Sequence, residues 1–400
     1  MSFKLSNPLS FMFSMLILFS TLYSAANSVL KLTGFFSVML LLSFNLFFIY
    51  FYMIIKKNQN LYADNSKIYI AFLLYVIWIG IGVLYSEEKK QGIQILLLSI
   101  LYISLLITIP NLKLTIINKK IINSIILIFF ILNFIYISIF YNTSRFSFYF
   151  SNPNSYAAFM YYLMFLFLMT FTTFKMFKLI KILFVLSITL TVAWLTQSLT
   201  MVLCFVISLT IIGSWKLITR NKLTYKLFFY TVLGSIIAFT YLYPLISFNH
   251  SFDNINQLFL EYTGQRFYSG RNKVWFDLIE LGSKNNFLGY GTGVLPKDLF
   301  RTDLSSHNLY LQIYIQNGLT SLVILFLIIN GIWNKIYKYK ENPNSKIFAS
   351  VFIGIIVHQT FEVTLLQNNI SIGTLQWILI AIGLNSISDR KENKIEKSIQ

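Results

Sequence analysis

Residues 227–247 read LFFYTVLGSIIAFTYLYPLIS, and none of these side chains is charged. A helix rises about 1.5 Å per residue, so a run of this length matches the hydrocarbon thickness of a bilayer, about 30 Å. Similar runs recur along the 400-residue chain, of which 56% is hydrophobic and only 12% charged. Soluble domains are about one quarter charged, so this pattern indicates an all-α, polytopic membrane protein.

The same length criterion predicts about 12 transmembrane helices. They are expected at residues 9–30, 32–55, 68–85, 92–110, 121–141, 156–174, 180–197, 199–217, 227–247, 309–333, 347–366 and 370–387. The first run resembles a signal peptide because Ser24, Ala25 and Ala26 suit a cleavage site. A single preceding lysine and a long apolar core favour a retained helix instead.

Basic residues predict the orientation of these helices. The net charge of +18 lies in short clusters between apolar runs, which is typical of membrane topology and not of nucleic-acid binding. About two thirds of the 32 Lys and Arg residues fall on the side that holds both termini, so both termini are expected in the cytoplasm.

Four regions follow from this topology: nine helices in 1–247, a long external loop in 248–307, three helices in 308–388 and a cytoplasmic tail in 389–400. Cys204 is the single cysteine, which excludes an intrachain disulfide and a zinc cluster of cysteines.

The external loop contains a predicted short amphipathic helix at residues 272–282. Its apolar face includes Trp275, and Ser269 is a plausible N-cap. Arg271 then lies at the positive end of the helix macrodipole, where a cation is favoured only if an anion also binds. The alternative is a solvated arginine paired with a nearby acid.

His307 stands at the predicted start of the next span, with Ser305 or Ser306 as its N-cap. A neutral histidine beside an anion site can act as a general base near pH 7. Asn308 and Gln312, four residues apart, would extend a polar stripe along the same helix. The alternative is a capping or interfacial histidine.

Three further features are open to two interpretations. The GYGTG turn at residues 289–293 lacks the Lys of a phosphate-binding loop and reads as a flexible turn. His358 and Glu362 are one helical turn apart within the span expected at 347–366, as either a functional or a structural pair. Asn154 lies in an Asn-Pro-Asn segment that suits a turn and a helix cap.

The motifs are more specific together than singly. They are SGR at residues 269–271 with Trp275 four residues on, GYGTG at 289–293, and SHNLYL at 306–311 followed by Gly318. Over residues 269–318 this pattern, in one long external loop of a polytopic protein, resembles the O-antigen polymerase/ligase superfamily.

The resemblance implies an inverting glycosyltransferase of the bacterial cytoplasmic (inner) membrane, active on its outer face without a metal, cofactor or nucleotide sugar. Glycans on undecaprenyl pyrophosphate would serve as donor and acceptor among the membrane lipids, with a flippase and a chain-length regulator as candidate partners. Arg271 would hold the pyrophosphate, and His307 would orient or deprotonate the acceptor hydroxyl.

The sequence departs from the family at one position. Members often carry an arginine after a Thr-x-Ser segment in a middle helix, whereas here Leu199 follows Ser198. Arg145 and Arg266 are the candidate replacements for that phosphate contact. The other predicted substrate-binding residues are Asn308, Trp275, Arg301, Glu362 and Asn154.

The leading hypothesis is therefore a polymerase of lipid-linked repeat units for a surface polysaccharide, either O-antigen or capsule. A ligase that transfers finished glycan to a terminal acceptor would share the same donor motifs. A transporter or flippase of lipid-linked sugars is the third hypothesis, and it predicts ionisable residues near the bilayer midplane and related halves of the chain.

Overall fold

The computed structural model describes residues 3–4, 7–55, 65–113, 116–140, 146–171, 177–247, 253–264, 270–300 and 305–399. The helices are α1 (Asn7–Ser20), α2 (Ser28–Ile55), α3 (Ser66–Tyr85), α4 (Lys89–Asn111), α5 (Ile116–Phe140), α6 (Pro153–Thr170), α7 (Phe177–Leu195), α8 (Leu199–Ile218), α9 (Lys222–Ser247), α10 (Asp253–Thr263), α11 (Arg271–Lys284), α12 (Pro296–Leu299), α13 (Leu309–Lys338), α14 (Pro343–His358) and α15 (Ile370–Ile399). A 3₁₀ turn, η1 (Thr21–Ser24), follows α1, and the two-residue strands β1 (Phe3–Lys4) and β2 (Leu112–Lys113) pair in parallel.

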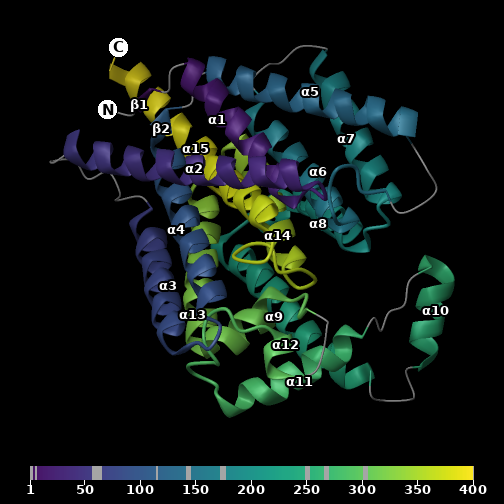
Figure 1. The fold of residues 1–400 in the computed structure, drawn as a ribbon. Coiled ribbons are helices and arrows are strands. Elements are labelled where there is room, and N and C mark those ends of the chain that lie inside the picture. Colours follow the sequence, from purple (N-terminus) through teal and green to yellow (C-terminus); the bar gives the residue numbers. More distant parts are fainter. Residues whose placement is uncertain are drawn as a thin grey trace.

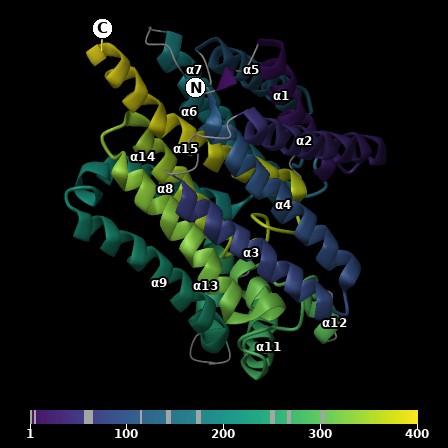
Figure 2. The same cartoon turned by 90° about the vertical axis from the view of Figure 1, so that its left-hand side faces the viewer.

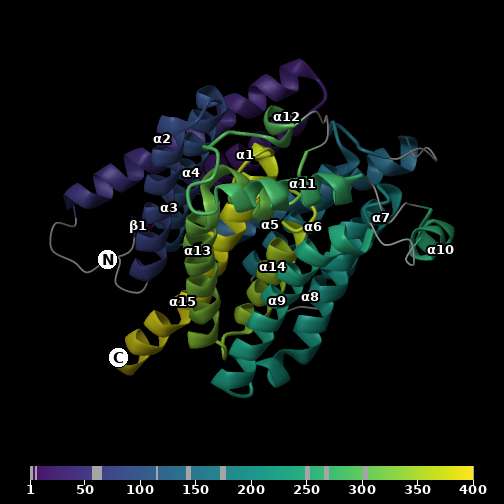
Figure 3. The same cartoon turned by 90° about the horizontal axis from the view of Figure 1, so that it is seen from below.

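The two ends of the helical bundle differ. Both chain termini and the β1–β2 pair lie at one end, and α11 and α12 lie at the other (Figure 1). Seen from that second end, α11 lies across the bundle against α9 and α13 (Figure 3). This arrangement agrees with the predicted separation of the termini from the long loop.

Within the described residues, eight helices are long and apolar enough to cross a membrane. These are α2, α3, α4, α5, α8, α9, α13 and α15. The chain is thus an all-α protein of the multi-pass membrane type. The remaining four predicted spans coincide with α1, α6, α7 and α14, which lie outside that set.

One predicted boundary is wrong. The span expected at 347–366 ends as a helix at His358, because residues 359–369 fold into a loop instead of continuing α14. In the predicted tail at 389–400, α15 continues as a helix to Ile399, beyond its apolar part.

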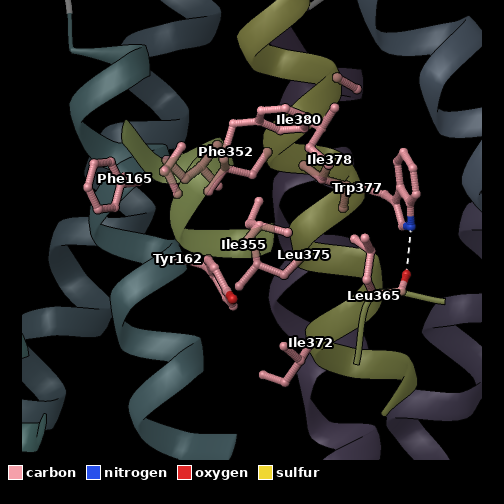
Figure 4. Close-up of a cluster of buried hydrophobic side chains, with 14 of the residues drawn as sticks. Tyr162, Phe165, Phe352, Ile355, Leu365, Ile372, Leu375, Trp377, Ile378 and Ile380 are labelled. Atoms are coloured by element: carbon pink, nitrogen blue, oxygen red, sulfur yellow. Dashed lines mark hydrogen bonds between the residues drawn. The ribbon is translucent and has the colours of Figure 1, made fainter. Parts of the chain in front are cut away.

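Helix α15 is the centre of the bundle, and its apolar residues 370–387 are all buried. It packs against α4, α6 and α14, while α3 and α13 run side by side on one flank (Figure 2). Side chains of α6, α14 and α15, including Tyr162, Ile355 and Leu375, form one apolar cluster (Figure 4). Trp377 in that cluster donates its indole N–H to the Leu365 carbonyl at 2.7 Å.

Helix α13 is kinked at Gly318, whose φ of 69° and ψ of −173° are not helical. A kink leaves backbone carbonyls of the preceding turn without helical partners, which is costly in an apolar environment. Here the carbonyls of residues 315 and 316 accept from the N–H groups of Tyr290 and Gly291, both at 2.8 Å. The next carbonyl, of Asn317, accepts from the Trp78 indole at 3.0 Å.

The turn at residues 289–293 is therefore a packed structural element, and the expectation of a flexible turn is wrong. Thr292 at its centre is fully buried and donates its hydroxyl to Asn317 at 2.7 Å. Glycine is required in this turn for two reasons: the backbone adopts positive φ, and a Cβ atom would collide with neighbouring backbone. Gly291 has a φ of +107°, and a Cβ there would lie 2.6 Å from the backbone of Ser86.

Gly291→Ala is expected to destabilise the folded protein by at least about 1–2 kcal/mol, because alanine is strained at positive φ and its Cβ meets backbone. Thermal unfolding of the full chain in detergent checks this. Gly213→Ala is the matched control, because a Cβ at Gly213 meets nothing within 4 Å. A Gly291→Ala protein as stable as the Gly213→Ala control would contradict the packed-turn description.

Candidate functional site

Helix α11 is held against the bundle by its apolar face. Val274, Trp275 and Leu278 are buried against Tyr243 of α9 and Leu311 of α13. This confirms the predicted amphipathic helix, which is slightly longer than expected at both ends. On its exposed face, the Glu280 carboxylate and the Lys284 ammonium, one helical turn apart, lie 3.7 Å from each other.

Arg271 is the first residue of α11, as predicted. The N-cap position belongs to Gly270, which adopts the left-handed conformation with a φ of 84°. The predicted cap, Ser269, lies outside the described residues. The Arg271 guanidinium donates from Nη1 to the Phe361 carbonyl at 3.4 Å. This contact brings α11 to the loop between α14 and α15.

His307, which precedes α13, contacts Glu362 of the α14–α15 loop. The two side chains come from opposite ends of the 308–361 segment, and His307 Nδ1 lies 3.2 Å from Glu362 Oε2. Both are partly exposed, with 31% of the histidine and 17% of the glutamate side chain accessible. The His307 backbone has a φ of +43°, a conformation rare for residues other than glycine, and its N–H donates to the Ser305 hydroxyl.

The start of α13 differs from the prediction, because Asn308 is the N-cap, not Ser305 or Ser306. The Asn308 side chain accepts from the backbone N–H groups of Tyr310 and Leu311 and donates to Thr240. It is fully buried. Asn308 therefore fixes the helix start beside His307, and its side-chain amide is used in the cap and in the contact with Thr240.

Trp275 was also expected to bind substrate, but its side chain is only 1% exposed. Its indole N–H donates to the Ser306 carbonyl at 2.6 Å, and its ring packs edge-on against Phe239 and Tyr243. The contact fixes the residue that precedes His307. Trp275 is thus a positioning residue.

His358 and Glu362 do not form the expected side-chain pair. Glu362 lies in the loop beyond α14, whereas His358 is buried at the end of that helix, with Nδ1 2.9 Å from the Tyr162 hydroxyl. The connection between them is through the backbone, since the Glu362 N–H donates to the His358 carbonyl at 3.0 Å.

The remaining predicted site residues separate into two groups. Asn154 is half-buried in the first turn of α6, where Asn152 accepts its backbone N–H and caps the helix as expected. The neighbouring Ser155 accepts from Asn369, so this turn adjoins the loop that carries Glu362. Arg145, Arg266 and Arg301 lie outside the described residues.

Two histidines and an arginine lie near the Glu362 carboxylate. Burial acts first and would raise its pKa, but the hydrogen bond and electrostatic interaction with His307, followed by those with His358 and Arg271, hold that pKa below its ordinary value. The carboxylate is therefore ionised near neutral pH. Because a carboxylate can only accept, His307 donates to it from Nδ1–H.

Sequence reasoning missed Gln359, which organises this loop. Its side-chain oxygen accepts from the backbone N–H groups of Thr364 and Leu365, and its carbonyl accepts from the N–H of Leu309. A glutamine inside an apolar run was the only signal for it.

Comparison with protein-family models and with curated proteins finds no match to the chain.

Glu362→Gln is expected to reduce the acid sensitivity of the fold. Because the folded-state pKa of Glu362 is lowered, its ionised form stabilises the protein above the ordinary value of 4.5, and this contribution is lost as pH falls through the folded pKa. Between about pH 6 and about pH 3.5, Tm should therefore fall less for Glu362→Gln than for the natural chain.

Glu280→Gln serves as the control for this titration, since Glu280 is an exposed carboxylate of the same region. It should lose as much Tm as the natural chain. Equal losses in the natural and Glu362→Gln proteins would show that the carboxylate contributes nothing to the fold at neutral pH.

Proposed function

We propose that the chain is a polymerase of undecaprenyl-pyrophosphate-linked oligosaccharide repeat units, acting by inverting glycosyl transfer on the outer face of the membrane. The supporting observation is that Arg271 of α11 contacts the α14–α15 loop at Phe361, next to Glu362, which pairs with His307. Helix α11 lies at the bundle end opposite the termini. These residues come from three separate segments. The motif resemblance over residues 269–318 supports the same function.

In this proposal His307 is the general base. Nδ1–H is held by the ionised Glu362, so Nε2, which makes no hydrogen bond to the described part of the chain, can take a proton from an acceptor hydroxyl. The hydroxyl oxygen then attacks the anomeric carbon of the donor glycan. The bond from that carbon to the pyrophosphate oxygen breaks, and the sugar inverts.

Arg271 would receive the leaving group. A guanidinium has five N–H donors, and this one makes a single hydrogen bond, to Phe361, among the described residues. It stands at the N-terminus of α11, where free backbone N–H groups and the macrodipole also favour an anion. Both features would stabilise the negative charge that develops on pyrophosphate.

The arrangement favours group transfer over transport. Arg271 begins α11, which lies at one end of the bundle, whereas a transporter is expected to place its charged groups near the midplane. A ligase remains the second candidate, because it would use the same donor site with a terminal acceptor. The acceptor distinguishes the two.

The test is complementation of a strain that lacks the gene, with surface glycan resolved as a gel ladder. His307→Ala should reduce polymer by about a hundred-fold or more, because it removes the general base. Arg271→Ala should cause a loss of similar size, because a charge-stabilising donor is removed. Lys273→Ala, an exposed cation two residues along the same helix, is the matched control and should leave the ladder unchanged.

Membrane levels of the variants must match for this comparison. Single repeat units remaining on the lipid carrier in both variants support a polymerase. Long glycan that forms but stays unattached indicates a ligase. Normal polymer from both variants would reject the site and the transferase function together.

A further inference from the structure

A cavity of about 350 Å³ opens beside the His307 loop. One wall is the first two turns of α4, with Gln91 and Gln94, and another is the segment from Leu295 to Lys297. Ligand sites of proteins begin at about 300 Å³, so the cavity has room for a small ligand.

The cavity is continuous with the two loops that carry the catalytic pair. Ser305, on its lining, accepts the backbone N–H of His307 at 3.1 Å. Asn368, also on the lining, belongs to the same α14–α15 loop as Glu362. A molecule in the cavity would therefore lie next to the proposed site of proton transfer.

The polar lining is mostly amide and hydroxyl. Gln91, Gln94 and Asn368 make no side-chain hydrogen bond with the described part of the chain, and Ser305 supplies a hydroxyl. Amides and hydroxyls both donate and accept, which matches the hydroxyl groups of a sugar. Among the described residues of the lining, Lys297 is the single charged one, whereas phosphate sites favour several Arg or Lys donors.

The rest of the lining is apolar and comes largely from Ile95, Leu98 and Pro296. Apolar walls with a few convergent polar groups are typical of small-molecule sites. Asn368 also adopts a left-handed backbone with a φ of +64°, and such strained residues cluster at ligand sites.

We propose that this cavity binds a neutral sugar ring of the lipid-linked glycan beside His307. The proposal rests on the proposed function and adds a recognition site to it: amides of α4 and of the α14–α15 loop read the sugar hydroxyls. Because the site lies on different residues from Arg271, it would determine which glycan is used and not how the pyrophosphate is held.

Amide removal is the first test. The double variant Gln91→Leu/Gln94→Leu should lower polymer in the complemented strain by about ten-fold, since two hydrogen bonds to substrate are lost without a change in side-chain size. Gln257→Leu, an exposed glutamine of α10, is the control and should leave polymer unchanged. Normal polymer from the double variant would overturn the proposal, as would a larger loss from Lys297→Ala, which would indicate an anionic ligand.

Occupancy of the cavity is tested directly by cysteine protection. Cys204 is fully buried, so Gln94→Cys introduces the accessible thiol, and Lys284→Cys on the exposed face of α11 is the control. Purified full-length protein is treated with a maleimide, with and without repeat-unit-loaded undecaprenyl pyrophosphate extracted from the deletion strain. The loaded carrier should slow labelling of Gln94→Cys several-fold and leave Lys284→Cys unaffected.

A parallel assay with sugar-free undecaprenyl pyrophosphate distinguishes binding of the sugar from binding of the lipid phosphate. Protection by the loaded carrier alone supports the proposal, and equal protection by the sugar-free carrier, or none by either, overturns it. A normal ladder from the natural gene together with unprotected Gln94→Cys would reject this cavity only. Failure of the natural gene to restore any ladder would reject the proposed function itself.

Discussion

The kink of α13 at Gly318 is the constraint on which the bundle end that carries α11 depends. A helix broken in an apolar environment must find donors for its released carbonyls. Here two of those donors are the N–H groups of Tyr290 and Gly291, at 2.8 Å each. The packed turn at residues 289–293 thereby attaches the predicted external loop to the bundle, and it fixes the positions of the segments on both of its sides.

The site follows from that attachment. Before the turn, α11 is buried through Trp275, whose indole N–H holds the Ser306 carbonyl. After it, Asn308 caps α13 and ties its start to α9 through Thr240. His307 stands between these two fixed residues with a strained backbone. Buried neighbours thus position a partly exposed imidazole, and fixed positions of this kind are what preorganised chemistry requires.

Apolar run length and periodicity were sufficient for the eight membrane-length helices and for the apolar face of α11, because both depend on local spacing. It failed where remote contacts decide. Ser305, Ser306 and Asn308 can each cap a helix, and the choice of Asn308 depends on Thr240 of another helix. Hydropathy likewise extended α14 through Glu362, because it cannot detect a loop folded back by Gln359. The GYGTG turn looked flexible since its partners at the α13 kink lie far along the chain.

Reconstitution of the purified chain in liposomes with lipid-linked repeat units tests the central claim most directly. The account predicts that glycan chains lengthen and that free undecaprenyl pyrophosphate appears in step with each new linkage. Both should be lost in the His307→Ala variant, because this variant lacks the imidazole that pairs with Glu362. Repeat units that cross the bilayer without any release of undecaprenyl pyrophosphate would contradict it and identify a transporter.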